Sequence, residues 1–254
     1  MDLRLKGRTA LVNGASQGIG YAIAHLLAEE GARVAVGARR EPALLAAAER
    51  IRSETGGEVV AIQGDIRRAE DCERLVATTV RELGELEILI NNDGAPPLGP
   101  VLAFDDEAWR KALDQNLMSV VRLSRAAVPH MRKLGGGAIV CNTALSVLQP
   151  LPGFSLSVAS WAGVIGYVKT LSLEVAADNI SVNTICPGII ETPRLKLVQS
   201  QSAELRDMTA EIPMKRAGDP EEIAALVALL VSPRGRYITG STIHIDGGAA
   251  RSLC

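Results

Sequence analysis

Short apolar runs rich in β-branched residues alternate with longer amphipathic segments along almost the whole chain. The apolar runs have the composition of buried strands, which we expect at residues 9–14, 33–38, 58–65, 86–92, 137–142, 180–186 and 241–246. The amphipathic segments predict helices at residues 19–32, 41–54, 69–83, 106–133, 155–177 and 220–231. Every predicted strand except the last is therefore followed by a predicted helix.

This alternation indicates the fold class. Strands that are apolar throughout and are each followed by a helix are typical of a parallel sheet with helices on both faces. We therefore expect one doubly wound α/β domain of about seven strands over residues 1–254. Ligands of such folds bind beyond the carboxyl ends of the strands, so the polar segment 193–213 is a candidate substrate lid.

Composition narrows the class of protein. The formal charge is −2, with 27 basic and 29 acidic residues interspersed, which argues against nucleic acid or an acidic membrane as a partner. The longest apolar runs are too short to cross a bilayer, and no secretion signal is visible. The four cysteines and three histidines are scattered, so we expect a cytoplasmic protein with reduced thiols and no metal site.

A glycine-rich stretch follows the first predicted strand. In "VNGASQGIG", Gly14, Gly18 and Gly20 stand where the strand ends and the first helix opens. Glycine there allows a tight turn and lets a diphosphate approach the amides of the helix N-terminus. The stretch predicts dinucleotide binding, with a purely structural turn as the alternative.

The end of the second predicted strand bears on the type of dinucleotide. NAD-selective sites usually place a carboxylate there for the ribose 2′-hydroxyl, whereas a 2′-phosphate needs an arginine. The chain reads "VGARRE", with Ala38 where an acid would stand, followed by Arg39 and Arg40. This favours NADP(H) over NAD(H); the alternative is a solvated basic pair at a helix start.

Together these motifs resemble those of the short-chain dehydrogenase/reductase family over essentially the whole chain. They are "NGASQGIG", "GDI" at 64–66, "NNDG" at 91–94, Asn116 in "DQNLMS", "PGIIETP" at 187–193 and the closing "YITGSTIHIDGG". The resemblance implies a Rossmann-like fold and a set of cofactor-binding residues. That set comprises Gly14, Ser16, Gln17, Gly18, Ile19 and Gly20 at the phosphates, Arg39 and Arg40 at the 2′-position, Asp65 and Ile66 at the adenine, Asn92 and Gly94 along the cofactor, and Pro187, Gly188, Ile190 and Thr192 at the nicotinamide end.

The family's catalytic serine, tyrosine and lysine are where this chain departs from the pattern. By the family's spacing, the serine position falls on Ala144, the tyrosine position on Ser157 and the lysine position on Trp161, while the supporting Asn116 is kept. No Tyr-x-x-x-Lys occurs anywhere in the chain. A positioned proton donor is worth about 10²- to 10⁴-fold in rate, so loss of the tyrosine should impair reduction severely.

Several residues are candidates for the altered chemistry. Ser157 can hydrogen-bond a substrate oxygen, and Asp93 in "NNDG" either supplies an acid or base or caps a turn. Trp161 either contacts the ligand or packs the space of the lysine. Ser146 and Thr143 are further hydroxyls that could replace the absent serine.

Three functions stay open on the sequence. The leading hypothesis is an NADP(H)-dependent oxidoreductase acting on a carbonyl or alcohol of a small molecule, with a proton path through Asn116, Ser157, Asp93 or water. The alternatives are a cofactor-binding regulatory or structural partner without redox activity, and a non-redox lyase or hydratase using the same pocket. The resemblance also implies a homo-oligomer, a tetramer or dimer, built on the two long helices.

Overall fold

The computed structural model describes residues 1–201 and 208–251, and its centre is a seven-stranded sheet in the order β3-β2-β1-β4-β5-β6-β7. Neighbouring strands all run parallel. The strands are β1 (Thr9–Asn13), β2 (Arg33–Ala38), β3 (Val59–Gln63), β4 (Ile88–Asn91), β5 (Gly137–Asn142), β6 (Ile180–Pro187) and β7 (Thr242–Ile245). Six of the seven strands lie within the ranges expected from the sequence, and β6 ends one residue beyond its range. The doubly wound α/β fold is therefore confirmed.

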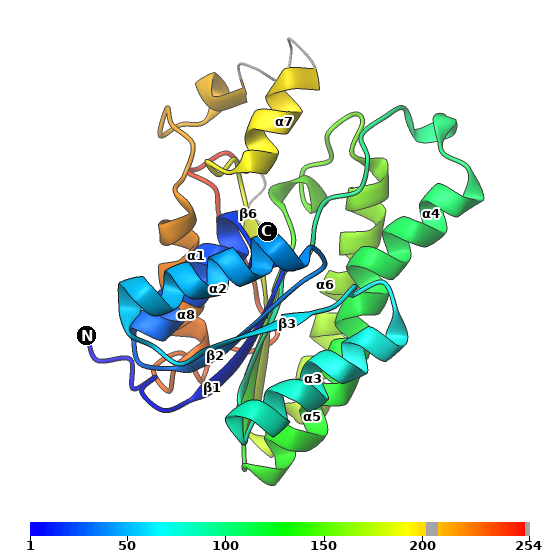
Figure 1. Ribbon diagram of the computed structural model, residues 1–254. Helices are drawn as coiled ribbons and strands as arrows, with labels where there is room; N and C mark the ends of the chain where they lie inside the picture. Colours follow the sequence, from blue (N-terminus) through cyan, green and yellow to red (C-terminus); the bar gives the residue numbers. More distant parts are fainter. Residues whose placement is uncertain (202–207, 252–254) are drawn as a thin grey trace.

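Helices cover both faces of this sheet, and one helix lies beyond its carboxyl edge (Figure 1). One face carries α1 (Gly18–Glu29), α2 (Glu41–Thr55) and α8 (Pro220–Val231). The other face carries α3 (Ala69–Leu83), α4 (Asp106–Leu113), α5 (Ser119–Lys133) and α6 (Ser155–Val175). The remaining elements are α7 (Pro193–Gln201) and the short turns η1 (Val101–Ala103), η2 (Asp114–Met118), η3 (Leu145–Val147), η4 (Ala176–Asp178) and η5 (Met208–Glu211).

The apolar strands create one hydrophobic core on each side of the sheet. Successive side chains of a strand point to opposite faces, so Ala10 and Val12 of β1 pack in the core beneath α1, α2 and α8. Leu11, between them, packs in the core beneath α3, α5 and α6. Because both faces are covered, the strands lack the alternation of polar residues seen in sheets with one wet face.

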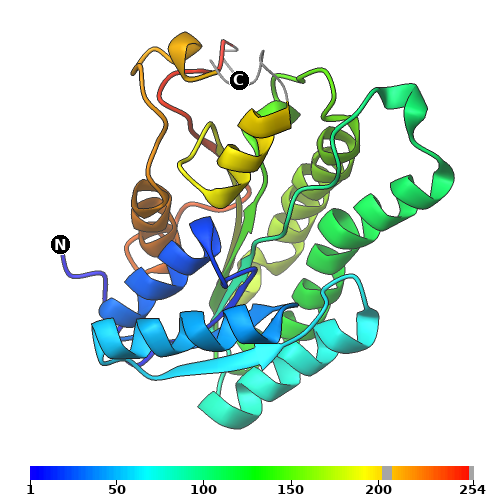
Figure 2. The ribbon, with the colours of Figure 1, turned by 45° about the horizontal axis from the view of Figure 1, so that its top comes forward.

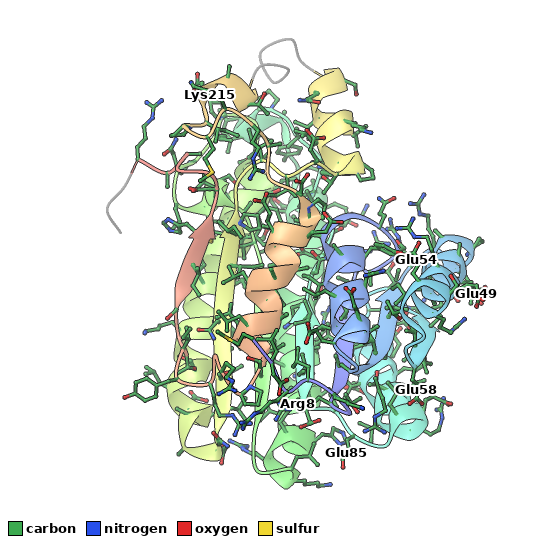
Figure 3. The ribbon with its side chains drawn as sticks, turned by 90° about the vertical axis from the view of Figure 1, so that its left-hand side faces the viewer. Arg8, Glu49, Glu54, Glu58, Glu85 and Lys215 are labelled. Carbon is green, nitrogen blue, oxygen red and sulfur yellow. The ribbon has the colours of Figure 1, made fainter. Side chains whose placement is uncertain are left out.

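The strand order reverses between β1 and β4, and the loops at the carboxyl edge part there. Figure 2 brings this edge toward the viewer, with α7 above it. Figure 3 shows Arg8 at the opposite end of the molecule from Lys215, which lies on the carboxyl side. Arg8 pairs with Glu87 at 3.4 Å and thereby ties the start of β1 to the start of β4.

The long helical stretch expected at 106–133 is present, with a wider turn inside it. α4 passes into the π-helical turn η2, which passes directly into α5. Asn116 lies in this turn and is fully buried. A π-turn inserts one residue into the helical ladder and often marks a functional site.

Helix α6 is the most apolar of the long helices. The stretch Ser155–Asp178 is long and apolar enough to cross a membrane by length and composition, with 39% of the relevant window buried inside the protein. It packs against β6 and the π-turn η2, and its residues Val164 and Val168 belong to the second core. The core helix of a soluble fold passes the same test, so one such helix is weak evidence for a membrane span.

The segment expected to form a lid begins as a helix. α7 runs from Pro193 to Gln201, and η5 follows at Met208–Glu211. The intervening residues 202–207 of the predicted lid lie outside the described residues. Cys254 lies outside them as well, whereas Cys72, Cys141 and Cys186 are buried free thiols, in keeping with a packing role.

Candidate functional site

In the turn after β1, a side chain would clash with backbone or side-chain atoms at two of the three glycine positions, Gly14 and Gly20. Gly14 has φ +62°, and a Cβ there would lie 2.6 Å from Asn92. A Cβ at Gly20 would lie 2.4 Å from the carbonyl oxygen of Gly14. Gly18 also has φ +62°, a conformation that L side chains rarely adopt, and it faces Thr192. The glycines therefore bring three backbone segments together at the carboxyl edge.

Helix α1 starts in this turn with its first amides free of side-chain caps. Gln17 holds the N-cap position in an extended conformation and makes no capping hydrogen bond. The first turn of α1 contains no acidic residue. Uncapped amides and the positive end of the helix dipole form a ready site for an anion.

Asn92 braces the glycine turn. Its Nδ2 donates to the carbonyl oxygens of Asn13 at 3.2 Å and Gly14 at 3.1 Å. Its Oδ1 accepts a hydrogen bond of 2.8 Å from Nδ2 of Asn142. The side chain thus joins the exits of β1, β4 and β5, a role that the motif "NNDG" alone does not reveal.

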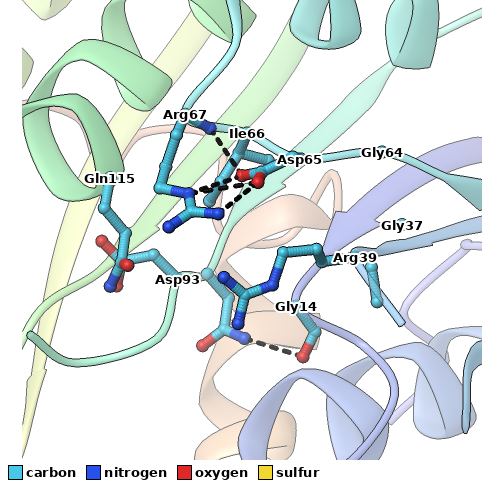
Figure 4. A pocket seen from close by; sticks show the side chains of 11 residues that line it. Gly14, Gly37, Arg39, Gly64, Asp65, Ile66, Arg67, Asp93 and Gln115 are labelled. Atoms are coloured by element: carbon cyan, nitrogen blue, oxygen red, sulfur yellow. Dashed lines mark hydrogen bonds and ion pairs between the residues drawn. The ribbon is translucent and has the colours of Figure 1, made fainter. Parts of the chain in front are cut away.

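A pocket opens beside the turn, between the carboxyl ends of β1, β2, β3 and β4 (Figure 4). Its sequence-predicted lining residues are Gly14, Arg39, Asp65, Ile66, Asn92 and Asp93. Lining residues that the sequence did not predict to bind the cofactor are Gly37, Ala38, Gly64, Arg67 and Gln115, although Ala38 and the motif of Gly64 were noted. Arg67 could have been predicted from the sequence, because it directly follows the motif "GDI" at residues 64–66.

The charges in this pocket are unequally paired. Asp65 accepts hydrogen bonds from Arg67, whose Nε lies 2.9 Å from Oδ1, and this pairing lowers the pKa of the Asp65 carboxyl. Arg39 has no ion pair or hydrogen bond through its side chain within residues 1–201 and 208–251. Figure 4 shows its guanidinium between the Asp65–Arg67 pair and Gly14. Arg39 and Arg40 are both exposed, and Arg40 lies at the start of α2, outside the lining of the pocket.

Asp93 and Trp161 contact each other. The indole Nε1 of Trp161 on α6 donates a 3.3 Å hydrogen bond to Oδ2 of Asp93 after β4. Trp161 is 7% exposed and packs in the second core, so its ring fills space between α5, α6 and the sheet. Asp93 keeps part of its surface exposed, but its carboxyl lies among poorly hydrated neighbours, and burial raises its pKa to about 8.

Two other candidate residues are enclosed. Ser157 is 1% exposed, and its hydroxyl has no hydrogen-bond partner among the described residues. Asn116 donates a 2.8 Å hydrogen bond from Nδ2 to Ser160, which ties the π-turn to α6. Ala144 follows β5 in an extended conformation and begins η3, where Ser146 is also buried and lacks a partner. Thr143 is bonded to the carbonyl oxygen of Ile185 at 3.0 Å.

The remaining predicted residues lie around the pocket without lining it. Gly94 follows Asp93, and its carbonyl oxygen accepts a hydrogen bond from Gln115. The stretch 187–192 leaves β6 and leads into α7, and it brings Thr192 against Gly18 of the glycine turn. Those outside the lining are Ser16, Gln17, Gly18, Ile19, Gly20, Arg40, Gly94, Pro187, Gly188, Ile190 and Thr192. In the described parts of the chain no cluster of three or more His, Cys, Asp or Glu residues is placed to hold a metal.

Known proteins share this architecture and much of the sequence. The family described as "Enoyl-(Acyl carrier protein) reductase" matches residues 14–250. Human dehydrogenase/reductase SDR family member 4 is 36% identical over 250 residues, which cover 98% of this chain and 90% of the human protein. The 3-oxoacyl-(acyl-carrier-protein) reductase of Vibrio cholerae is 38% identical over 247 residues, covering 97% of this chain and 98% of that protein.

A solved structure extends the likeness to three dimensions. L-sorbose reductase from Gluconobacter frateurii, crystallised with NADPH and L-sorbose, superposes with a TM-score of 0.93 at 33% identity and covers 100% of both chains. The likeness thus extends over the whole fold. The chain belongs to the short-chain dehydrogenase/reductase family of oxidoreductases.

Proposed function

We propose that this protein is an NADP(H)-dependent oxidoreductase that acts on a carbonyl or alcohol of a small molecule with an atypical proton donor. The observation that carries the proposal is the guanidinium of Arg39, which lines the pocket beside the glycine turn and has no ion pair or hydrogen bond with the described residues. A 2′-phosphate distinguishes NADP(H) from NAD(H), and an arginine after the second strand is its usual partner. The structurally similar L-sorbose reductase and actinorhodin polyketide ketoreductase were both crystallised with NADPH, which supports this choice.

The residues around the turn fit a dinucleotide. The space that a Cβ would fill at Gly14 and the uncapped start of α1 suit a close-lying diphosphate. Asp65 and Ile66 would hold the adenine, and the stretch 187–192 would hold the nicotinamide end. When bound, the cofactor supplies or accepts the hydride.

The proton donor must differ from the family's tyrosine, whose position we assign to Ser157, with the serine position at Ala144 and the lysine position at Trp161. Among the candidates, we propose Asp93. Burial raises its pKa to about 8, so near neutral pH the carboxyl is largely protonated and can give up a proton. Ser157 is the weaker candidate because its hydroxyl is enclosed and ionises only at very high pH.

In the reduction direction, Asp93 would donate its proton to the carbonyl oxygen, and a bound NADPH would supply the hydride for the carbonyl carbon. The alcohol forms, and the Asp93 carboxylate regains a proton from water. Trp161 holds the carboxyl through its N–H and limits the water around it. Asn116 keeps the π-turn fixed against α6 beneath this region.

A second candidate function, cofactor binding without redox turnover, is favoured by one observation. Ser157 and Trp161 are 1% and 7% exposed, so neither presents an accessible polar group at the position of the usual catalytic residues. A protein with this site would bind the dinucleotide and act as a regulatory or structural partner.

Cofactor binding is tested by titrating tryptophan fluorescence with NADPH and NADH and confirming the result by calorimetry. We expect tighter binding of NADPH, and we expect Arg39→Gln to weaken NADPH binding about 10- to 100-fold while leaving NADH unchanged. Arg110→Gln is a matched control, because that side chain is 67% exposed on α4. Equal affinities of the wild type for both cofactors would contradict the NADP(H) assignment.

Redox turnover is tested with a panel of carbonyl compounds followed at the NADPH absorbance. Asp93→Asn should remove most of the activity if Asp93 is the proton donor, since an amide does not donate a proton at neutral pH. Unchanged activity of this variant would dismiss Asp93. A wild type that binds NADPH but is inactive, together with an active Ala144→Ser/Ser157→Tyr/Trp161→Lys variant, would favour the second candidate function.

We further propose that the protein forms a dimer or tetramer and that α7 with the following residues covers the substrate. The exposed face of α6 carries small residues, Ala159, Ala162 and Gly166, which allow close helix packing. Light scattering coupled to size-exclusion chromatography measures the oligomer, and a monomer at micromolar concentration would contradict it.

A further inference from the structure

Arg194 in the first turn of α7 spans the carboxyl edge of the sheet. Its Nη2 donates a 3.2 Å hydrogen bond to the carbonyl oxygen of Pro96, which lies 98 positions away in the segment after β4. The side chain is half-buried. It therefore connects the segment that follows β6 with the segment that follows β4.

This guanidinium has no counter-ion. Across residues 1–201 and 208–251, the bond to Pro96 is its one side-chain interaction, and no carboxylate pairs with it. Burial lowers the pKa of Arg194, and no neighbouring charge offsets that effect. A desolvated cation is costly unless an anion or several hydrogen bonds compensate.

The position of Arg194 in its helix adds a second cost. Thr192 caps α7 by accepting a 3.3 Å hydrogen bond from the amide of Leu195, so Arg194 lies at the positive end of the helix dipole. Cations are disfavoured there and anions are favoured. Both the dipole and the guanidinium therefore attract negative charge to the same place.

The region that Arg194 spans contains buried polar groups without partners. β5 lies between β4 and β6, so the side chain crosses near the exit of β5. Beyond that exit, the buried hydroxyl of Ser146 has no partner within residues 1–201 and 208–251, and neither has that of Ser157 on the adjoining α6. Buried hydroxyls normally have partners, and a ligand at this edge would provide them.

We propose that Arg194 receives an anionic group, a phosphate or a carboxylate, of a ligand bound at the carboxyl edge between the exits of β4 and β6. Arginine suits this role because its planar fork binds either group through two parallel hydrogen bonds. The anion has two possible sources: the cofactor diphosphate, since Thr192 faces Gly18 of the glycine turn, or an acidic group on the carbonyl substrate. The assignment of these sources rests on the proposed function.

The first experiment measures anion binding without cofactor. Inorganic phosphate is titrated calorimetrically into Arg39→Gln, which removes the guanidinium that lines the pocket beside the glycine turn, and into Arg39→Gln/Arg194→Gln. We expect saturable binding in the millimolar range for the single variant and a loss of about 10-fold or more for the double variant. Arg39→Gln/Arg194→Lys should retain part of the affinity, and Arg39→Gln/Arg81→Gln, whose second site is 67% exposed, should retain all of it.

The second experiment identifies the source by measuring the NADPH affinity of Arg194→Gln. A loss of about 10-fold or more assigns the anion to the cofactor diphosphate. Unchanged NADPH affinity together with lost phosphate binding assigns it to the substrate, whose class is then a carbonyl compound bearing a carboxylate or phosphate.

The two proposals fail in different ways. Unchanged phosphate and NADPH affinities in the Arg194→Gln variants, with unaltered circular dichroism, overturn the role of Arg194. A wild type that does not bind NADPH refutes the proposed function, while the phosphate titration still decides whether Arg194 receives an anion.

Discussion

Asp93 should make the stability of this protein fall as the pH rises, and Asp93→Asn should remove that dependence. The folded-state pKa is raised by burial from its ordinary 3.8 to about 8, so the folded protein binds a proton that the unfolded chain releases. Stability is therefore highest below pH 4 as far as this group is concerned. It is lost progressively between about pH 4 and pH 8.

The size of the effect follows from the shift. At about 1.4 kcal/mol per pKa unit, the full difference is about 6 kcal/mol, and about 4 kcal/mol of it is reached by pH 7. Because part of the Asp93 side chain contacts water, solvent screening reduces these values, and we expect about 2 to 4 kcal/mol. Asparagine keeps the shape and the oxygen that accepts from Trp161 but carries no charge, so the variant should be the more stable protein at pH 8.

The assay is urea unfolding of the wild type and Asp93→Asn at pH 5, 6, 7 and 8. The difference in the free energy of unfolding between the two proteins should grow steadily over this range. Asp106→Asn serves as the control, because its side chain is 93% exposed at the start of α4. A difference that stays constant with pH would refute the reasoning, since it would show that Asp93 is ionised in the folded protein throughout.

Three further variants test other contacts in the site. Trp161→Phe removes the hydrogen-bond donor to Asp93 and should lower the free energy of unfolding by about 1 to 3 kcal/mol in urea unfolding. In an Asp93→Leu background the same change should cost less, because the acceptor is already absent. The same variant should raise the pKa of Asp93 further, because a hydrogen bond that favours the carboxylate is lost; the pH dependence of unfolding then moves upward. Gly14→Ala should cost at least about 1 to 3 kcal/mol and abolish NADPH binding in calorimetry, since its Cβ would lie 2.6 Å from Asn92 at φ +62°. Arg67→Ala should return the pKa of Asp65 toward its ordinary value, which carboxyl NMR titration measures directly; an unmoved value would show that other groups hold it down.

The cofactor-binding part of the site, around the glycine turn, was more predictable from the sequence than the part around Asp93 and Trp161. The glycine turn was predictable because a strand, three glycines and a helix start occupy consecutive positions, and the positive φ of Gly14 and Gly18 is a local property of the turn. Arg39 and Asp65 were predictable for a similar reason, since each follows the end of a strand. The carboxyl ends of parallel strands meet at one edge whatever the rest of the chain does.

For the part of the site around Asp93 and Trp161, the sequence named the candidate residues but not the contacts between them. The sequence favoured a turn cap over an acid or base for Asp93, and it did not decide between a ligand contact and packing for Trp161. The hydrogen bond between them joins positions 68 apart and depends on how closely α6 approaches β4. That approach is set by packing of the whole second core, which no local pattern encodes.

By itself, the sequence determined the order and nature of the elements, the parallel sheet and the anion-binding turn, because hydrophobic periodicity and backbone sterics act over a few residues. Only the tertiary structure decided which polar groups meet and which lose water. Among the described residues, it left the exposed guanidinium of Arg39 without an ion pair, enclosed the hydroxyl of Ser157 and brought Arg194 to Pro96 across 98 positions. Desolvation depends on every element packed around a group, and it is desolvation that raises the pKa of Asp93 and leaves Arg194 in need of an anion.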